Sequence, residues 1–439
     1  MSDLLLIFIY IFCFIAVFMN LIYFINIIKT RRFMKYKKQK MFDIENQSED
    51  KIDLLVVLPC LREQNIICES IDYFMKLNRK HVNLHILISC TKRELETNSK
   101  YGFTQSSAEV ARQYIKKLPD DDVKFFVYEA NDLMDGDRAT QMNEAVKTYL
   151  NQNKINVVAV FDADSRPEFN TFEEVAYEYK IDPSVVYQQP ENYMYSVEQM
   201  AKGKKRGVVL SNALYQNMWT VIREIPMFLS YAKNHKKYMY MNGHGMFFPV
   251  DIYKKIEFPE HEVTDGIHIG FRVSMLQENL KPLTCLGFTD PPHEVSKLPQ
   301  QHKRWYGGAV RLKSCFDWAK TKGKKPNLAF WFEGVWDVIR WACTANVFII
   351  TFIANLVLIS LSNNIFAYIS LGILSFSFLL YCYLFPLWCA KVIDSKRCIH
   401  FSAILFMPIA VLFKSFGPDL FIVEKIFRRK IKYQKCERL

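Results

Sequence analysis

Hydrophobic residues follow two different patterns in this chain: long uncharged runs near its ends, and short runs separated by polar segments in between. Residues 4–28 carry no charged side chain and would extend about 38 Å as a helix, enough to cross a bilayer. Long apolar runs return at residues 343–361 and 365–390. The run at residues 399–413 is short and is broken by Pro408, which favours a re-entrant or interfacial helix. The ends of the chain are therefore predicted to lie in a membrane.

The middle of the chain alternates short apolar runs with amphipathic segments. Short apolar runs bounded by turn residues predict buried strands, and apolar positions three or four residues apart predict helices. Strands that alternate with helices build βαβ units. The sequence thus predicts an α/β domain with a mostly parallel, Rossmann-like sheet. We expect strands at residues 54–58, 84–88, 123–128, 155–161, 185–189 and 246–248. We expect helices at residues 65–79, 106–117, 139–150, 169–179, 207–233 and 263–278.

Together the two patterns divide the chain into five parts. Residues 1–28 are a predicted transmembrane helix and residues 29–50 a basic linker. The α/β domain covers residues 51–325, and an aromatic, amphipathic helix at the membrane interface covers residues 326–341. Residues 342–439 are predicted to hold two full crossings, one partial crossing and a basic tail.

The distribution of charged residues predicts how the membrane segments are oriented. The formal net charge is +12, and basic clusters flank the apolar runs, as at residues 29–40 and 425–435. Such clusters mark the cytoplasmic side and contact anionic membrane lipids. We therefore expect an integral protein of the cell or inner membrane whose α/β domain is cytoplasmic. Nucleic-acid binding is not expected, because no nucleic-acid motif accompanies the clusters. Eleven cysteines without a Cys-x-x-Cys pair indicate a reducing compartment, not a zinc site or a disulfide framework.

The first candidate for chemistry is the pair Asp162 and Asp164, which directly follows the strand predicted at residues 155–161. The carboxyl ends of strands in α/β sheets are where ligands bind. Two hard oxygen ligands so close together suit Mg²⁺ or Mn²⁺, ions that usually bridge to substrate phosphates. A polar turn without a metal is the alternative interpretation.

Three other short motifs accompany Asp162 and Asp164 along the chain. The chain has Pro59 to Glu63 after the first strand, Thr264-Asp265-Gly266 further on, and Gln301-His302-Lys303-Arg304-Trp305 before the C-terminal spans. With the paired aspartates, this set resembles the membrane-bound family-2 glycosyltransferases, from residue 54 to the C-terminus. The resemblance implies a GT-A fold and inverting transfer of a hexosyl or N-acetylhexosaminyl group. The donor would be a nucleotide-sugar, with UDP expected, and the acceptor a lipid-linked or glycan hydroxyl at the cytoplasmic membrane face.

The resemblance also implies roles for individual residues. Asp162 and Asp164 would hold the divalent cation, and Asp265 would be the general base unless it only caps the helix that begins there. The family usually has a second acid after this position, where the chain has Gly266. An aspartate usual after the second strand is also missing, because the chain has Ser89 and Cys90 there. The expected donor-binding residues are Pro59, Glu63, Arg138, Asp162, Gln301, Arg304 and Trp305. The expected acceptor-binding residues are Gly243, His244, Gly245 and Trp305.

Three other functions can be weighed against this one. A processive polysaccharide synthase that also exports its product would need more crossing helices, unless a homo-oligomer or an accessory membrane subunit supplied them. An inactive sugar-binding scaffold would fit the two missing acids, since folds outlive activities. A transporter does not fit, because the spans show no repeated halves.

Overall fold

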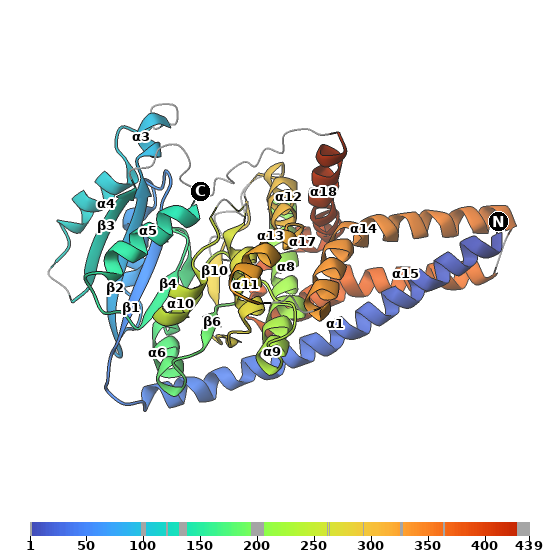
Figure 1. Cartoon of the computed structure of the whole chain (residues 1–439). Helices are drawn as coiled ribbons and strands as arrows, with labels where there is room; N and C mark the ends of the chain where they lie inside the picture. Colours follow the sequence, from blue (N-terminus) through green and yellow to red (C-terminus); the bar gives the residue numbers. More distant parts are fainter. Residues whose placement is uncertain are drawn as a thin grey trace.

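A computed structural model describes residues 2–97, 102–119, 122–130, 138–194, 206–260, 262, 264–292, 294–324, 328–362 and 365–427. The basic tail predicted after residue 427 therefore lies outside the described residues. An α/β domain occupies one end of the molecule and long helices extend from the other (Figure 1).

The α/β domain is built on a seven-stranded sheet with the order β3-β2-β1-β4-β8-β6-β9. The first four of these strands are parallel, as the alternation of strands and helices predicts. β8 is antiparallel to both of its neighbours, so the sheet is mixed but mostly parallel. The strands are β1 (Ile52–Pro59), β2 (Val82–Thr91), β3 (Lys124–Ala130), β4 (Val157–Val160), β6 (Val186–Gln188), β8 (Met246–Pro249) and β9 (Leu280–Pro282).

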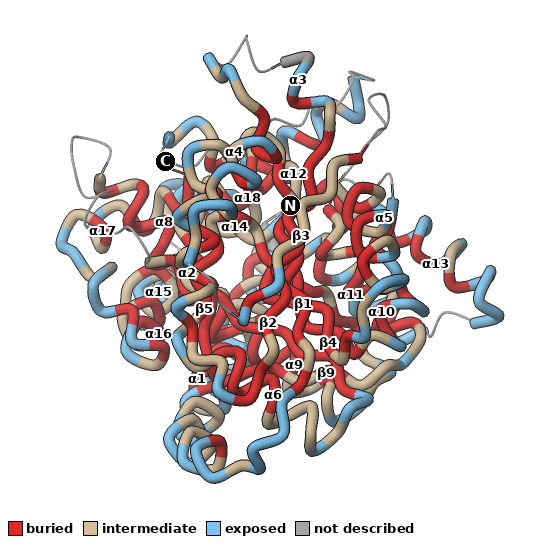
Figure 2. The backbone as a smooth tube through the Cα atoms, turned by 90° about the vertical axis from the view of Figure 1, so that its left-hand side faces the viewer, coloured by how far each residue is buried: buried red, intermediate tan, exposed pale blue. Residues whose placement is uncertain are grey.

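Helices cover both faces of the sheet because its central strands are apolar on both sides. In β1, Leu54 and Val56 belong to one core and Leu55 and Val57 to the other, as expected when side chains alternate along a strand. The sheet is accordingly the most deeply buried part of the domain (Figure 2). The first core includes α2 (Ile67–Met75), α4 (Ser107–Ile115) and α6 (Thr171–Ile181). The second includes α5 (Arg138–Leu150), α9 (Ile225–Lys233), α10 (Val250–Ile256) and α11 (Asp265–Leu276).

A small second sheet extends the α/β domain toward the helical end. It has the order β5-β10-β7, and none of its strands is longer than three residues. The strands are β5 (Arg166–Pro167), β7 (Glu191–Tyr193) and β10 (Gly287–Thr289). The sequence did not predict them, because segments this short carry no hydrophobic period.

A layer of helices joins the α/β domain to the apolar segments. α12 packs closely on α18: a side chain at Gly417 of α18 would begin 2.5 Å from the Cβ atom of His302 in α12. Helix α8 packs on α16, α17 and α18 through a shared apolar core. The elements of this layer are α8 (Arg206–Trp219), the π-helical η2 (Thr220–Glu224), α12 (Lys297–Ala309), α13 (Leu312–Thr321), α16 (Phe385–Val392), α17 (Phe401–Leu405) and α18 (Met407–Ile426).

Three described helices are long and apolar enough to cross a membrane. They are α1 (Ser2–Glu45), α14 (Leu328–Ser362) and the helix that begins as α15 (Ile365–Leu379) and continues through η3 (Leu380–Leu384) into α16. Tyr10 of α1 contacts Phe366 of α15, so the amino end of α1 lies beside the start of α15 (Figure 1). Large apolar side chains point outward from these helices, including Phe14, Phe18, Leu21, Ile350, Ile353, Phe366 and Phe376.

The helical boundaries differ from the sequence prediction in several places. The helix expected at residues 399–413 is divided into α17 and α18, and α18 continues to Ile426. Residues 29–45, expected as part of a linker, continue α1. Their basic side chains pair with acids of the α/β domain: Lys40 Nζ lies 2.6 Å from Glu178 and 3.1 Å from Glu174. These ion pairs hold the polar end of the helix against the domain. Of the interfacial helix expected at residues 326–341, the described residues 328–341 are likewise continuous with the following span in α14.

Candidate active site

The paired aspartates occupy a tight turn at the carboxyl end of β4. Asp162 and Asp164 are both half-buried. The backbone N–H of Asp162 donates to Ser165 Oγ at 3.1 Å, and the N–H of Ser165 donates to the carbonyl of Asp162 at 3.0 Å. These bonds close the turn and hold both carboxylates at the strand edge.

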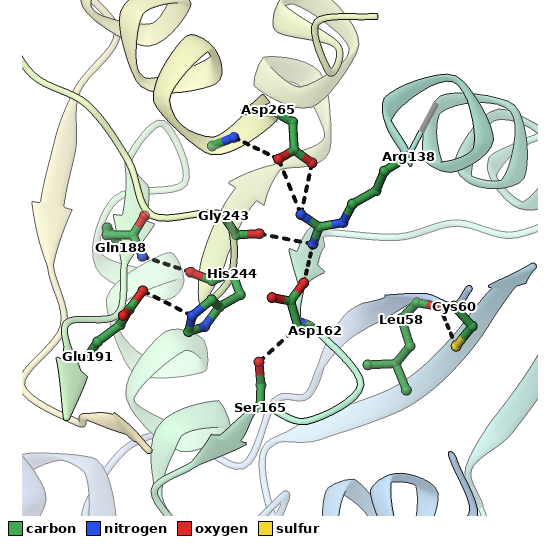
Figure 3. Close-up of polar contacts among 11 residues, drawn as sticks. Leu58, Cys60, Arg138, Asp162, Ser165, Gln188, Glu191, Gly243, His244 and Asp265 are labelled. Carbon is green, nitrogen blue, oxygen red and sulfur yellow. Dashed lines mark hydrogen bonds and ion pairs between the residues drawn. The ribbon is translucent and has the colours of Figure 1, made fainter. Parts of the chain in front are cut away.

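Arg138, the first residue of α5, connects the aspartate turn to α11 (Figure 3). Its guanidinium donates to Asp162 Oδ1 at 2.5 Å and to both carboxylate oxygens of Asp265, at 2.9 and 3.2 Å. It also donates to the carbonyl of Gly243 at 3.0 Å. Burial alone would lower the pKa of Arg138, but Asp162, Asp265 and Asp164 together raise it, so the guanidinium stays charged.

Three carboxylates and one guanidinium make up this cluster, so acidic groups predominate in it. We call the cluster of Arg138, Asp162, Asp164 and Asp265 the donor-side half of the site. Its oxygen donors and its charge fit a divalent cation. In the described residues no three His, Cys, Asp or Glu side chains are placed to share one ion. An ion held by Asp162 and Asp164 would therefore take its other ligands from a substrate and from water.

The fold explains why position 266 is a glycine, where the resemblance leads us to expect a second acid. A Cβ atom at Gly266 would lie 2.5 Å from the backbone of Gly243. No side chain fits there while α11 packs against the loop that holds Gly243. Asp265, one residue earlier, points instead toward Arg138 (Figure 3).

That loop, residues 242–245, carries the three residues predicted to contact the acceptor. Gln188 of β6 holds it in place, donating to the carbonyl of His244 at 3.0 Å and accepting from the N–H of Asn242 at 3.2 Å. Gly245 has a φ of +64°, which favours glycine. His244 Nε2 lies 2.9 Å from Glu191 Oε1, so the imidazole is oriented by a buried carboxylate (Figure 3).

The last motif lies on α12 and reaches the same space. A cavity of about 380 Å³ is lined by Asp162 and Asp265 and also by Arg304 and Trp305. Gln301 is buried, does not line the cavity, and its Oε1 atom has no hydrogen-bond partner among the described residues. Sequence positions 162, 265 and 304 thus converge on one cavity, whereas Asp164 and Gln301 do not line it.

Pro59 and Glu63 do not line this cavity. They lie at the end of β1 and in the loop after it, where the N–H of Glu63 donates to Ser107 Oγ at 2.9 Å. Glu94, which the sequence analysis did not single out, shapes this loop. Its buried carboxylate accepts from the N–H of Arg62 at 2.6 Å and from the N–H of Ser107 at 2.7 Å. Pro59 and Glu63 remain predictions as donor contacts.

The far end of the cavity is made by residues that the motifs did not indicate. It is lined by Tyr215 and Trp219 of α8, Asp337 and Trp341 of α14 and Lys414 of α18, which we call the membrane-side half. No sequence motif marks these residues, because they come together only when the three helices pack.

Two glutamates lie between the halves. Glu191 and Glu224 both line the cavity and are both buried. Burial, and then the nearby charge of Glu191, raises the pKa of Glu224 to about 8. Glu224 is therefore mainly protonated at neutral pH and can donate a hydrogen bond.

A second charged cluster fixes α11 against α12 behind the cavity. His268 Nε2 lies 3.0 Å from the carbonyl of Gly308, and its Nδ1 atom lies 3.4 Å from Glu262 and 3.5 Å from Cys315 Sγ. Burial opposes protonation, but Cys315 and Glu262 together raise the pKa of His268 to about 10. The imidazolium thus bridges the helices that carry Asp265 and Arg304.

Among known protein families, one family profile matches the chain. The profile described as glycosyl transferase family group 2 matches residues 157–391, which include the aspartate turn, Asp265 and α12. No curated protein sequence matches the chain.

Several solved structures are similar to the chain at low sequence identity. One is the mannosyltransferase PcManGT from Pyrobaculum calidifontis in complex with GDP-Man and Mn²⁺, with a TM-score of 0.49 and 12% identity over 95% of this chain and 99% of that one. Another is TarS 1–349 from S. aureus, with a TM-score of 0.40 and 13% identity over 87% of this chain and 93% of that one. The same TarS fragment in complex with UDP-GlcNAc has a TM-score of 0.39 and 10% identity over 88% and 98%.

Proposed function

The chain belongs to glycosyl transferase family group 2, and from that premise we propose that it transfers a sugar from a nucleotide-sugar to a lipid-linked or glycan acceptor at the membrane surface. The observation that carries the proposal is the common cavity of Asp162, Asp265, Arg304 and Trp305. The charges in this cavity match the parts of such a donor: acids for a metal–diphosphate and a guanidinium for phosphate oxygens.

Donor binding is assigned to the strand edge and to α12. Asp162 and Asp164 would hold a divalent cation, which when bound supplies positive charge to the departing diphosphate. Arg304 donates paired hydrogen bonds to phosphate oxygens, a geometry that lysine lacks. Trp305 offers an aromatic face for the sugar or the nucleotide.

Proton removal is assigned to Asp265. The acceptor oxygen bonds to the anomeric carbon as the bond from that carbon to the diphosphate breaks, and Asp265 takes the hydroxyl proton. Attack from the face opposite the leaving group inverts the anomeric centre. Before the reaction, Arg138 holds both oxygens of Asp265, so the acceptor must displace part of that contact. Arg138 is then available to the donor phosphates.

Three candidate spans and the basic residues of α1 support a membrane enzyme with its active site on the cytoplasmic side. The same number of spans favours a single transfer over coupled polymerisation and export. A processive synthase would have to obtain its channel from other subunits.

A donor screen tests this function. Membranes that contain the full chain are incubated with radiolabelled nucleotide-sugars and Mn²⁺, and lipid and polymer fractions are then separated. We expect label from one donor to appear in the lipid extract. This label should be lost when Mn²⁺ is chelated and in the Asp164→Asn variant. Asp251→Asn, at an exposed position on α10, should behave as the wild type.

Two results would revise the proposal. Label in alcohol-insoluble polymer would favour the processive synthase. No transfer or hydrolysis of any donor by a folded chain would favour the inactive scaffold.

A further inference from the structure

Lys414 places a buried amine in the membrane-side half of the cavity, where burial, and then the charge of Arg340, lowers its pKa well below the ordinary value. The residue is only 5% exposed, and its Nζ atom lies 3.8 Å above the ring of Trp219. Among the described residues no carboxylate or carbonyl accepts a hydrogen bond from Nζ. A buried charge in this position is costly unless a partner arrives.

The neighbours of Lys414 add positive charge. Arg223 and Arg340 both donate to one carboxylate, that of Asp337, at 3.0 and 2.5 Å. Arg340 also lies over the ring of Trp219, 5.2 Å from its centroid, on the ring that Lys414 contacts. Two guanidinium groups therefore share one carboxylate beside the amine of Lys414, which leaves one positive charge in excess. Glu224 does not compensate it, because Glu224 is mainly protonated at neutral pH.

This charge is opposite to that of the donor-side half. There, three carboxylates lie around the one guanidinium of Arg138. A metal-bound diphosphate fits the negative end, whereas an anion without a metal fits the positive end. The two ends of the cavity thus select different ligands.

We propose that Lys414, supported by Arg340 and Arg223, binds the phosphate group of an anionic lipid that serves as the acceptor. This inference rests on the proposed function and names the class of acceptor that it leaves open. A phosphate matches the site because its negative charge favours the protonated form of Lys414, which can then donate to phosphate oxygens. Arg340 and Arg223 do not line the cavity and contribute through their charge. The indole of Trp219 forms one wall beside it.

A lipid, rather than a soluble phosphate, is favoured by the helices that carry the site. Asp337 and Arg340 belong to α14, which continues into a candidate span with outward-facing Ile350 and Ile353. A lipid with its phosphate at Lys414 can place its chains along that helix. The hydroxyl to be glycosylated then points along the cavity toward Asp265, which lines the same space.

The test measures lipid binding without any donor. The full-length chain in detergent micelles is titrated calorimetrically with dioctanoyl phosphatidylglycerol, dioctanoylglycerol or glycerol 3-phosphate. We expect phosphatidylglycerol, which has both a phosphate and free hydroxyls, to bind, and Lys414→Met to weaken its binding about tenfold or more. Lys414→Arg should restore most of the affinity. Lys425→Gln, at an exposed position on the same helix, should leave it unchanged.

Three outcomes would overturn the proposal: equal affinity in Lys414→Met and the wild type, equally tight binding of dioctanoylglycerol, or glycerol 3-phosphate binding as tightly as the lipid. The last would indicate a site for a free phosphate. Because no donor is present, lipid binding can be found even if sugar transfer is not. Conversely, if Lys414→Met transferred sugar with the wild-type rate and the wild-type acceptor KM, the lipid site at Lys414 would be rejected. The proposed function would then still stand.

Discussion

The two halves of the cavity are built in opposite ways. The donor-side half consists of acidic side chains at strand and helix ends, and Arg138 holds them together. The membrane-side half consists of three aromatic residues, one lysine and one aspartate from three packed helices. The residues of the donor-side half come from short sequence motifs, whereas those of the membrane-side half are brought together by helix packing. Changes in the first should therefore affect the chemical step, and changes in the second should affect the acceptor.

The largest expected effect is on the chemical step. Asp265→Asn removes the group assigned to take the acceptor proton while keeping its size, so kcat should fall about 100-fold or more. The donor dissociation constant should change little. Steady-state transfer and donor binding, measured on one preparation, check this. Asp317→Asn, at an exposed position on α13, is the matched control, and a kcat close to the wild-type value in Asp265→Asn would assign the base elsewhere.

The next largest effect is on donor binding. Arg304→Lys keeps the charge but loses paired hydrogen bonding, so the donor KM should rise about tenfold. Arg397→Lys, the same substitution at an exposed residue that does not line the cavity, is the control. If Arg304→Lys raised the acceptor KM and left the donor KM unchanged, Arg304 would contact the acceptor and not the donor.

A steric test addresses the contact that shapes the donor-side half. Gly266→Ala places a methyl group 2.5 Å from the backbone of Gly243, so α11 and the loop at residues 242–245 must separate. Overpacking of this kind costs about 1–3 kcal/mol, measurable as a lower denaturation midpoint. Gly372→Ala is the control, since nothing lies within 4 Å of its Cβ position. Equal stability of the two variants would show that the loop adjusts freely.

The smallest expected effect is a pH dependence between the two halves. Glu224 has a folded pKa of about 8 against an ordinary 4.5, so the folded protein keeps a proton that the unfolded chain releases. Stability should therefore fall as pH rises from about 4.5 to about 8. Glu224→Gln should flatten this slope in thermal denaturation from pH 5 to 9, and the exposed Glu49→Gln should not. An unchanged slope in Glu224→Gln would place the titrating group elsewhere.

Much of the α/β domain was predictable because its signals are local. Runs such as residues 54–58 and 84–88 became β1 and β2, and the aspartate pair followed β4 as expected. The antiparallel direction of β8 was not predictable, because a four-residue apolar run carries no sign of its direction. The helical course of residues 29–45 depends on distant partners, such as the pairs that Lys40 makes with Glu174 and Glu178.

The candidate site divides in the same way. Asp162, Asp265 and Arg304 could be selected from the sequence because each occurs in a short motif. Lys414 and Trp219 could not, because each lies in an apolar or aromatic segment that reads as core or membrane. Only the packing of α8 on α18 brings the amine of Lys414 over the indole of Trp219.

The central claim, that the strand-edge acids and the guanidinium of α12 act on one donor, is tested most directly by a double-mutant cycle in donor affinity. The dissociation constant of the nucleotide-sugar with Mn²⁺ is measured for the wild type, Asp164→Asn, Arg304→Lys and the double variant. Groups that hold the same diphosphate should couple, with an interaction energy of about 1 kcal/mol or more. Effects that add to within about 0.5 kcal/mol would mean independent sites and would contradict the account.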